Sequence, residues 1–202
     1  MKTSELEQCI YWSLVKNGTY LCFEVMIPRE IETVVRCGVG KMSDSVYHKM
    51  SRERVDLLQY EKNGTWRFYE LKVSVSDFRS KCYNSFYGHY NYYVMPREIY
   101  DKVKDEIPDF VGCYCPVESS YKPMCVCVKR AKRRELAVDE DKLKFNFMQS
   151  LSRTVEHYQL QKFKEMCAKK SEVKNNEQKT HKKRLVKKKS TVSGSACSLF
   201  GE

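Results

Sequence analysis

The chain has 202 residues, enough for one domain with a sizeable core but few for two. Its composition, 42% hydrophobic and 12% aromatic, is typical of a globular protein and excludes an intrinsically disordered one. The net charge is +11, but ten Lys or Arg against two Glu fall between Lys169 and Lys189, so the total gives little support by itself for nucleic-acid binding.

Two further observations concern the compartment. No run approaches the roughly 20 apolar residues that span a bilayer. Residues 1–7 lack the apolar segment of a secretory signal. We therefore expect a cytoplasmic protein whose ten cysteines are thiols.

The first predicted elements are a helix and a strand. Residues 4–17 show helical apolar spacing, and Ser4 precedes Glu7 at the interval of a capping box. An apolar strand follows over 20–27 and is expected to end at Pro28. The next segment is polar and forms a long connection, of a kind that is often functional; it covers residues 29–52.

A β-hairpin is predicted next, with strands over 54–60 and 66–73. Asn-Gly in the connection is a strong hairpin signal. A three-residue loop, Lys62-Asn63-Gly64 with Gly64 in the left-handed region, would put Asp56 directly opposite Glu70. A two-residue loop would instead put these two acids on opposite faces.

Further elements follow from turn residues and hydrophobic spacing. We expect a helix capped by Ser76 and ended by Gly88, an aromatic strand closed by Pro96, and a long final helix before a segment too charged to fold alone. The predicted ranges are a helix at 76–87, a strand at 90–95, a helix at 96–107, strands at 111–115 and 124–129, and a helix at 139–168.

Two Cys-x-Cys pairs raise the alternative of a zinc site. Structural zinc sites generally use wider Cys spacing. Both pairs also occur in strand-like alternation, which favours two cysteines on one strand face. The residues are Cys113, Cys115, Cys125 and Cys127.

The predicted hairpin carries the chemistry. Alternation puts Glu70 and Lys72 on one face of their strand and turns Leu71 and Val73 to the core. Paired carboxylates of Asp56 and Glu70 would suit Mg²⁺, or Mn²⁺ in its place. A neighbouring lysine can stabilise charge on a phosphate, so the pattern suits hydrolysis of phosphodiesters.

At these residues the chain resembles a known family. Arg-Val-Asp at 54–56, Tyr-Glu-Leu-Lys-Val-Ser at 69–74, Ser-Asp-Phe-Arg at 76–79 and the aromatic run 88–96 are similar to the PD-(D/E)XK nuclease superfamily. More narrowly, they resemble the MmcB-like DNA-repair endonucleases of bacteria and their phages. The resemblance covers residues 4–136 and extends to the Lys-Arg-Ala-Lys segment at 129–132.

The resemblance implies a helix–strand–strand–strand–helix–strand core, and Mg²⁺-dependent cleavage of DNA in a bacterial or phage-infected cell. It assigns Asp56, Glu70 and Lys72 as the motif. An acid from the first helix would complete the metal site, with Glu7 first and Glu5 second; Glu24 on the first strand is a third candidate.

We therefore predict an α/β PD-(D/E)XK domain with a central mixed sheet flanked by helices over 1–136, a C-terminal helix over 137–168, and a flexible basic tail over 169–202. Residues 29–52 could form a DNA-contacting flap. The candidate DNA contacts are Lys81, Tyr83, His89, Lys182, Lys183 and Arg184. For His89 a structural or positioning role is favoured over that of a general base.

The last residues suggest a protein partner. Ala196 to Phe200 resembles the short peptide by which bacterial replication proteins dock on the sliding clamp, through Ser198, Leu199 and Phe200, although its usual leading Gln is absent.

The predicted function is that of a metal-dependent DNA endonuclease in repair, replication or recombination. Two alternatives stay open: a non-catalytic DNA-binding or replication accessory protein that keeps the nuclease fold, and a nuclease directed at RNA.

Overall fold

The computed structural model describes the backbone of residues 1–35, 45–80, 84–119 and 121–193. Side chains are described for residues 1–27, 53–80, 84–119 and 121–169. The chain divides into two compact units, Met1–Ser152 and Arg153–Glu202, and each is considered by itself.

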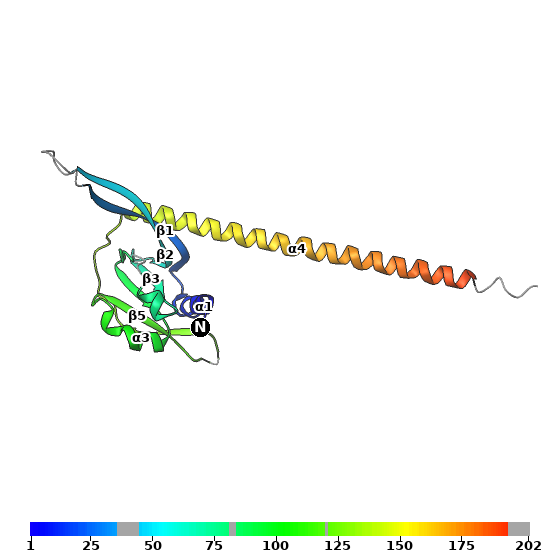
Figure 1. The fold of residues 1–202 in the computed structure, drawn as a ribbon, viewed down its shortest axis with the longest axis horizontal. Coiled ribbons are helices and arrows are strands. Elements are labelled where there is room, and N and C mark those ends of the chain that lie inside the picture. The colour runs from blue at the N-terminus through cyan, green and yellow to red at the C-terminus, as the bar shows by residue number, and fades with distance from the viewer. Residues whose placement is uncertain (36–44, 81–83, 120, 194–202) are drawn as a thin grey trace, which may run out of the picture. The chain divides into compact units, whose positions relative to one another are not determined.

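The first unit is built on a six-stranded mixed sheet with the order β1-β2-β3-β4-β5-β6. The β3–β4 and β4–β5 pairs are parallel, and the other three pairs are antiparallel. This arrangement confirms the α/β class with a central mixed sheet (Figure 1). The elements are α1 (Thr3–Leu14), β1 (Thr19–Val35), β2 (Ser45–Glu61), β3 (Trp66–Leu71), α2 (Val75–Phe78), β4 (Tyr90–Val94), α3 (Arg97–Val103), the 3₁₀ helix η1 (Lys104–Glu106), β5 (Val111–Val117), β6 (Met124–Lys129) and α4 (Glu140–Ser193).

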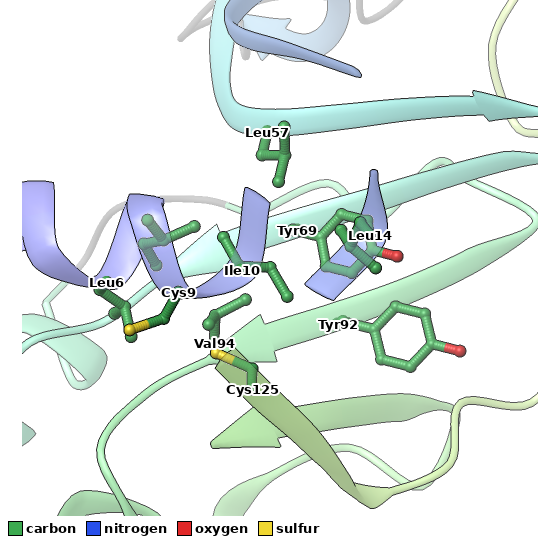
Figure 2. Packing of buried hydrophobic residues seen from close by; sticks show 10 residues of the cluster. Leu6, Cys9, Ile10, Leu14, Leu57, Tyr69, Tyr92, Val94 and Cys125 are labelled. Carbon is green, nitrogen blue, oxygen red and sulfur yellow. The ribbon is translucent and has the colours of Figure 1, made fainter. Parts of the chain in front are cut away.

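Helix α1 covers one face of the sheet. Its buried Leu6 and Ile10 belong to a cluster with Leu57 of β2, Tyr69 of β3 and Val94 of β4, and Figure 2 shows these side chains meeting between the helix and the strands. Full burial of each such aliphatic side chain contributes roughly 1.5–3 kcal/mol, so the cluster fixes α1 against the strands.

The other face carries two clusters. Leu143 and Phe147 at the start of α4 pack with Leu58, Trp66 and Phe68 of β2 and β3. A neighbouring cluster is centred on strands β4 and β5, below α3; it comprises Phe86, Tyr93, Met95, Val103, Ile107, Val111, Cys113 and Cys115. The sheet is therefore covered on both faces, as expected for an α/β protein.

The inward-facing side chains of β1 and β2 switch from one face of the sheet to the other at a single position along the strands. The antiparallel ladder passes from Phe23–Leu57 to Val25–Val55, and between them Glu24 has a φ of +54°, in the left-handed region. Leu57 belongs to the cluster beneath α1, whereas Val55 belongs to the cluster beneath α4. This irregularity lies at the level of Asp56, which follows Val55 in β2.

Two expectations near the N-terminus were wrong. Helix α1 begins at Thr3, and Glu5 rather than Glu7 closes its first turn, because Glu5 Oε2 accepts a hydrogen bond from the Lys2 amide at 2.9 Å. Strand β1 does not end at Pro28 but pairs with β2 as far as Val35. An edge strand tolerates a proline, since one side of its backbone needs no partner. Much of 29–52 is therefore strand.

The helix predicted over 76–87 was also wrong, because α2 ends at Phe78. The cap is Ser74, whose Oγ accepts a hydrogen bond from the Asp77 amide at 3.0 Å, and not Ser76. Gly88 is not a helix stop: a Cβ there would overlap Phe68, so a close approach to β3 requires the glycine.

The remaining elements lie near their predicted ranges. Strands β4, β5 and β6 are confirmed, and the helix predicted from Pro96 is α3 followed by η1. Helix α4 begins after Asp139, whose Oδ1 accepts a hydrogen bond from the Lys142 amide at 2.8 Å. It continues to Ser193, past the predicted end at 168, through Lys, Glu and Gln residues of good helix propensity. Among the described residues, no helix has the length and apolar character to cross a membrane.

The cysteine pairs lie on different faces of the sheet. Cys113 and Cys115 share one face of β5 and belong to the cluster beneath α3, as the alternation predicts. Cys125 of β6 packs instead in the cluster beneath α1, and Cys127 is exposed. This separation is unsuited to a site made from all four thiolates.

Candidate active site

The β2–β3 hairpin has the register that the three-residue loop predicts. Leu57 pairs with Tyr69 and Leu58 pairs with Phe68, while Gly64 has a φ of +81°. The Gly64 amide donates to the Glu61 carbonyl at 2.9 Å. Continued by one residue from the Leu57–Tyr69 pair, this register puts Asp56 opposite Glu70.

The two strands part at this position. The backbone pairing of β2 with β3 ends at Leu57–Tyr69. Beyond it, Oδ2 of Asp56 accepts a hydrogen bond from the Leu71 amide at 2.8 Å. A side-chain acceptor therefore stands where a backbone carbonyl would continue the ladder. This exchange fixes the Asp56 carboxylate between the two strands.

Glu70 is buried, with only 6% of its surface exposed. Burial, the negative charge of Asp56 and the charge of Glu53 raise the pKa of Glu70 to about 9, and a hydrogen bond with Asp56 acts in the same direction. Burial also raises the pKa of Asp56, against the opposing effects of the Leu71 amide and Lys72. The two facing carboxyls therefore hold a proton between them at neutral pH.

Lys72 lies beside this pair and is 5% exposed. Its amide donates to the Val94 carbonyl at 2.9 Å, which extends the pairing of β3 with β4 past Leu71. Leu71 and Val73, on the opposite face, pack in the cluster beneath α1, as the alternation predicts. The burial of Lys72 beside the carboxyl pair, which keeps one negative charge, puts opposite charges where water screens them weakly.

Helix α1 brings a further acid towards Asp56. Burial raises the pKa of Glu7, and the negative charges of Glu24 and Asp56 raise it further. The Glu24 carboxylate is largely exposed and lies 3.5 Å from the Arg54 guanidinium. Since the Glu5 carboxylate caps the helix, Glu7 is the better placed of the two candidates on α1.

The side chains at the hairpin fit a hard divalent cation. Within the part of the chain whose side chains are described, no three or more His, Cys, Asp or Glu form a group that could hold a metal ion. Asp56 and Glu70 supply carboxylate oxygens, and Mg²⁺ commonly binds one or two protein carboxylates while keeping several waters. A bound cation would take the place of the proton on Glu70, because both neutralise the negative charge of the Asp56–Glu70 pair.

His89 lies at the other end of β3. Its Nδ1 accepts a hydrogen bond from the amide of Trp66, the first residue of the strand, at 3.0 Å. This contact with the backbone supports a structural role over that of a general base. Other predicted contacts lie outside the described side chains: Lys81, Tyr83, Lys182, Lys183, Arg184, Ser198, Leu199 and Phe200.

Two acids near the pair were missed as site residues. Glu53 is buried beside Glu70, and its Oε1 accepts a hydrogen bond from the Ser85 amide at 2.7 Å. Asp77 lies 4.0 Å from the Lys72 ammonium. The interval from Ser74 to Asp77, typical of a helix start, was the available signal for Asp77. No sequence signal pointed to Glu53.

Comparisons with known proteins add little to this geometry. No protein-family model and no curated protein matches the sequence. Among solved structures, the fold is similar to the SPO1766 protein of unknown function from Silicibacter pomeroyi, with a TM-score of 0.49 and 14% sequence identity. That match covers 80% of this chain and 89% of the other.

Proposed function

We propose that this chain is an Mg²⁺-dependent DNA endonuclease of the PD-(D/E)XK kind, acting in DNA repair, replication or recombination. One observation carries the proposal: the register of the hairpin puts Asp56 opposite Glu70 where β2 and β3 part, and the buried Lys72 follows directly after β3. The element order α1-β1-β2-β3-α2-β4 agrees with the core that the sequence resemblance implies.

The roles follow from the side-chain chemistry. Asp56 and Glu70 would hold Mg²⁺ or Mn²⁺, with Glu7 as the candidate third acid. When bound, such a cation supplies Lewis-acid stabilisation of phosphate charge and acidifies a water molecule. Lys72 presents a point positive charge that stabilises an attacked phosphate, and its low exposure strengthens that interaction.

Cleavage of a mixed set of single-stranded, duplex and branched DNAs, with a matched RNA, tests the proposal. The wild type is compared with Asp56→Ala and Lys72→Ala in Mg²⁺, in Mn²⁺ and in EDTA. Asp109→Ala is the matched control, because its side chain is 94% exposed and its carboxylate lies 3.6 Å from the Lys132 ammonium.

Metal-dependent cutting by the wild type and the control, lost in both site variants, is the expected result. Preferential cutting of RNA would change the substrate class and keep the reaction. If every protein binds DNA equally well and none cuts, the accessory DNA-binding alternative replaces the nuclease.

A further inference from the structure

Asp77 occupies a fixed position a few residues after β3, which carries Glu70 and is followed by Lys72. It lies in α2, and its backbone amide donates a hydrogen bond to Ser74 Oγ at 3.0 Å. The next residue, Phe78, packs edge-on against Tyr93 of β4 with ring centroids 5.1 Å apart. Arg79 then donates two hydrogen bonds to the Glu106 carboxylate, at 2.6 and 3.1 Å. These contacts hold α2 against β4 and η1.

The two oxygens of the Asp77 carboxylate contact two successive residues just after β3. Its Oδ2 accepts a hydrogen bond from the Val73 amide at 3.0 Å. Its Oδ1 lies 4.0 Å from the Lys72 Nζ, an ion pair whose lysine side chain is only 7% exposed. An ammonium this buried depends strongly on its counter-charge, because little water is available to solvate it.

This contact bears on where the ammonium points. Among the described residues, Asp77 is the carboxylate within ion-pair distance of Lys72, whereas Asp56 and Glu70 face each other. The Asp77 side chain is 38% exposed, while Glu70 is buried. The ion pair therefore holds the ammonium beside the more exposed Asp77 carboxylate.

We infer that Asp77 is a positioning residue for Lys72, holding its ammonium clear of the Asp56–Glu70 pair and towards the substrate. The inference rests on the proposed nuclease function for its catalytic meaning. The substitution Asp77→Asn separates the charge of this residue from its structural hydrogen bond, because the asparagine oxygen can still accept a hydrogen bond from the Val73 amide.

The first experiment compares Asp77→Asn and Asp77→Glu with the wild type in steady-state cleavage of the preferred DNA. Asp101→Asn is the matched control, since Asp101 forms an exposed ion pair with Arg97 at 3.1 Å on α3. We expect Asp77→Asn to lower kcat about tenfold with KM changed less than about twofold, because a misdirected lysine weakens transition-state contacts more than binding. Asp77→Glu should restore part of kcat, and the control should match the wild type.

The second experiment needs no cleavage activity. Lysine acylation by an amine-reactive ester is followed residue by residue with mass spectrometry. In Asp77→Asn the Lys72 amine should react several-fold faster than in the wild type, while Lys144, paired with Glu140 at 3.1 Å, keeps its rate as an internal reference.

The outcomes separate the two proposals. An unchanged kcat in Asp77→Asn, or an unchanged Lys72 acylation rate, overturns the positioning role. Equal losses in the Asn and Glu variants, accompanied by a lower Tm, would also overturn it in favour of a purely structural role. If the wild type cuts no nucleic acid, the proposed function fails, and the acylation rates alone decide whether Asp77 holds Lys72.

Discussion

Replacement of Glu70 by Gln removes the carboxyl that the fold holds in its protonated form beside Asp56. An amide has nearly the same shape and can still donate a hydrogen bond to the Asp56 carboxylate. The variant therefore keeps the packing around a buried position and removes its titration. Its effect on stability should depend on pH in a way that the structure specifies.

The sign follows from proton binding. Burial raises the pKa of Glu70 from its ordinary value of 4.5 to about 9, so between these values the folded chain binds a proton that the unfolded chain has lost. The stabilising contribution is complete below pH 4.5 and disappears as the pH rises towards 9. The slope approaches about 1.4 kcal/mol per pH unit, which makes a loss on the order of 4 kcal/mol between pH 5 and pH 8.

Urea unfolding at several pH values, in EDTA and followed by fluorescence of the buried Trp66, measures this difference. Glu70→Gln should equal the wild type near pH 5 and exceed it increasingly up to pH 8. Glu118→Gln, at an exposed carboxyl, is the control and should follow the wild-type curve. Parallel curves for the wild type and Glu70→Gln would refute the reasoning, because they would mean that Glu70 ionises as readily when folded as when unfolded.

Three further predictions use the same unfolding assay. Added Mg²⁺ should stabilise the wild type more at pH 8 than at pH 5 and should have little effect on Glu70→Gln, since the cation competes with the Glu70 proton; equal shifts in both proteins would argue against the site. His89→Ala should cost about 1–3 kcal/mol, because it leaves the Trp66 amide without its acceptor; an unchanged free energy of unfolding would contradict this contact. Gly88→Ala should cost about 1–3 kcal/mol from overlap with Phe68. Gly64→Ala, in open space but at a φ of +81°, should cost only about 1 kcal/mol, so the reverse order would contradict the packing described.

The hairpin was predictable because its determinants are local. Asn63-Gly64 selects the loop, the loop sets the register, and alternation along β3 then brings Glu70 opposite Asp56 and turns Leu71 to the core. These steps depend on residues fewer than twenty apart, so no distant contact is needed to anticipate them.

The errors occurred where distant contacts decide the local structure. Gly88 has the sequence appearance of a helix end, but its conformation serves a close approach to Phe68 on β3. Pro28 is compatible with a strand only because β1 is the edge of the sheet, a position that the sequence does not reveal. Glu53 joins the site through the effect of its charge on Glu70 and through the hydrogen bond from the Ser85 amide, which no spacing in the sequence indicates.

The change of face at Glu24 has a mechanical consequence. Leu21, Phe23, Val25 and Ile27 form one unbroken alternation in the sequence, yet Leu21 and Phe23 pack under α1 while Val25 and Ile27 pack under α4. The β1–β2 pair therefore contributes side chains to the core beneath α1 and to the core beneath α4, and Asp56 lies where it passes from one core to the other. Removal of a single residue there would turn one set of these side chains out of its core. Separation of β1 from β2 would destabilise both cores at once. The rates of amide hydrogen exchange in α1 and in the first turns of α4 should therefore increase together.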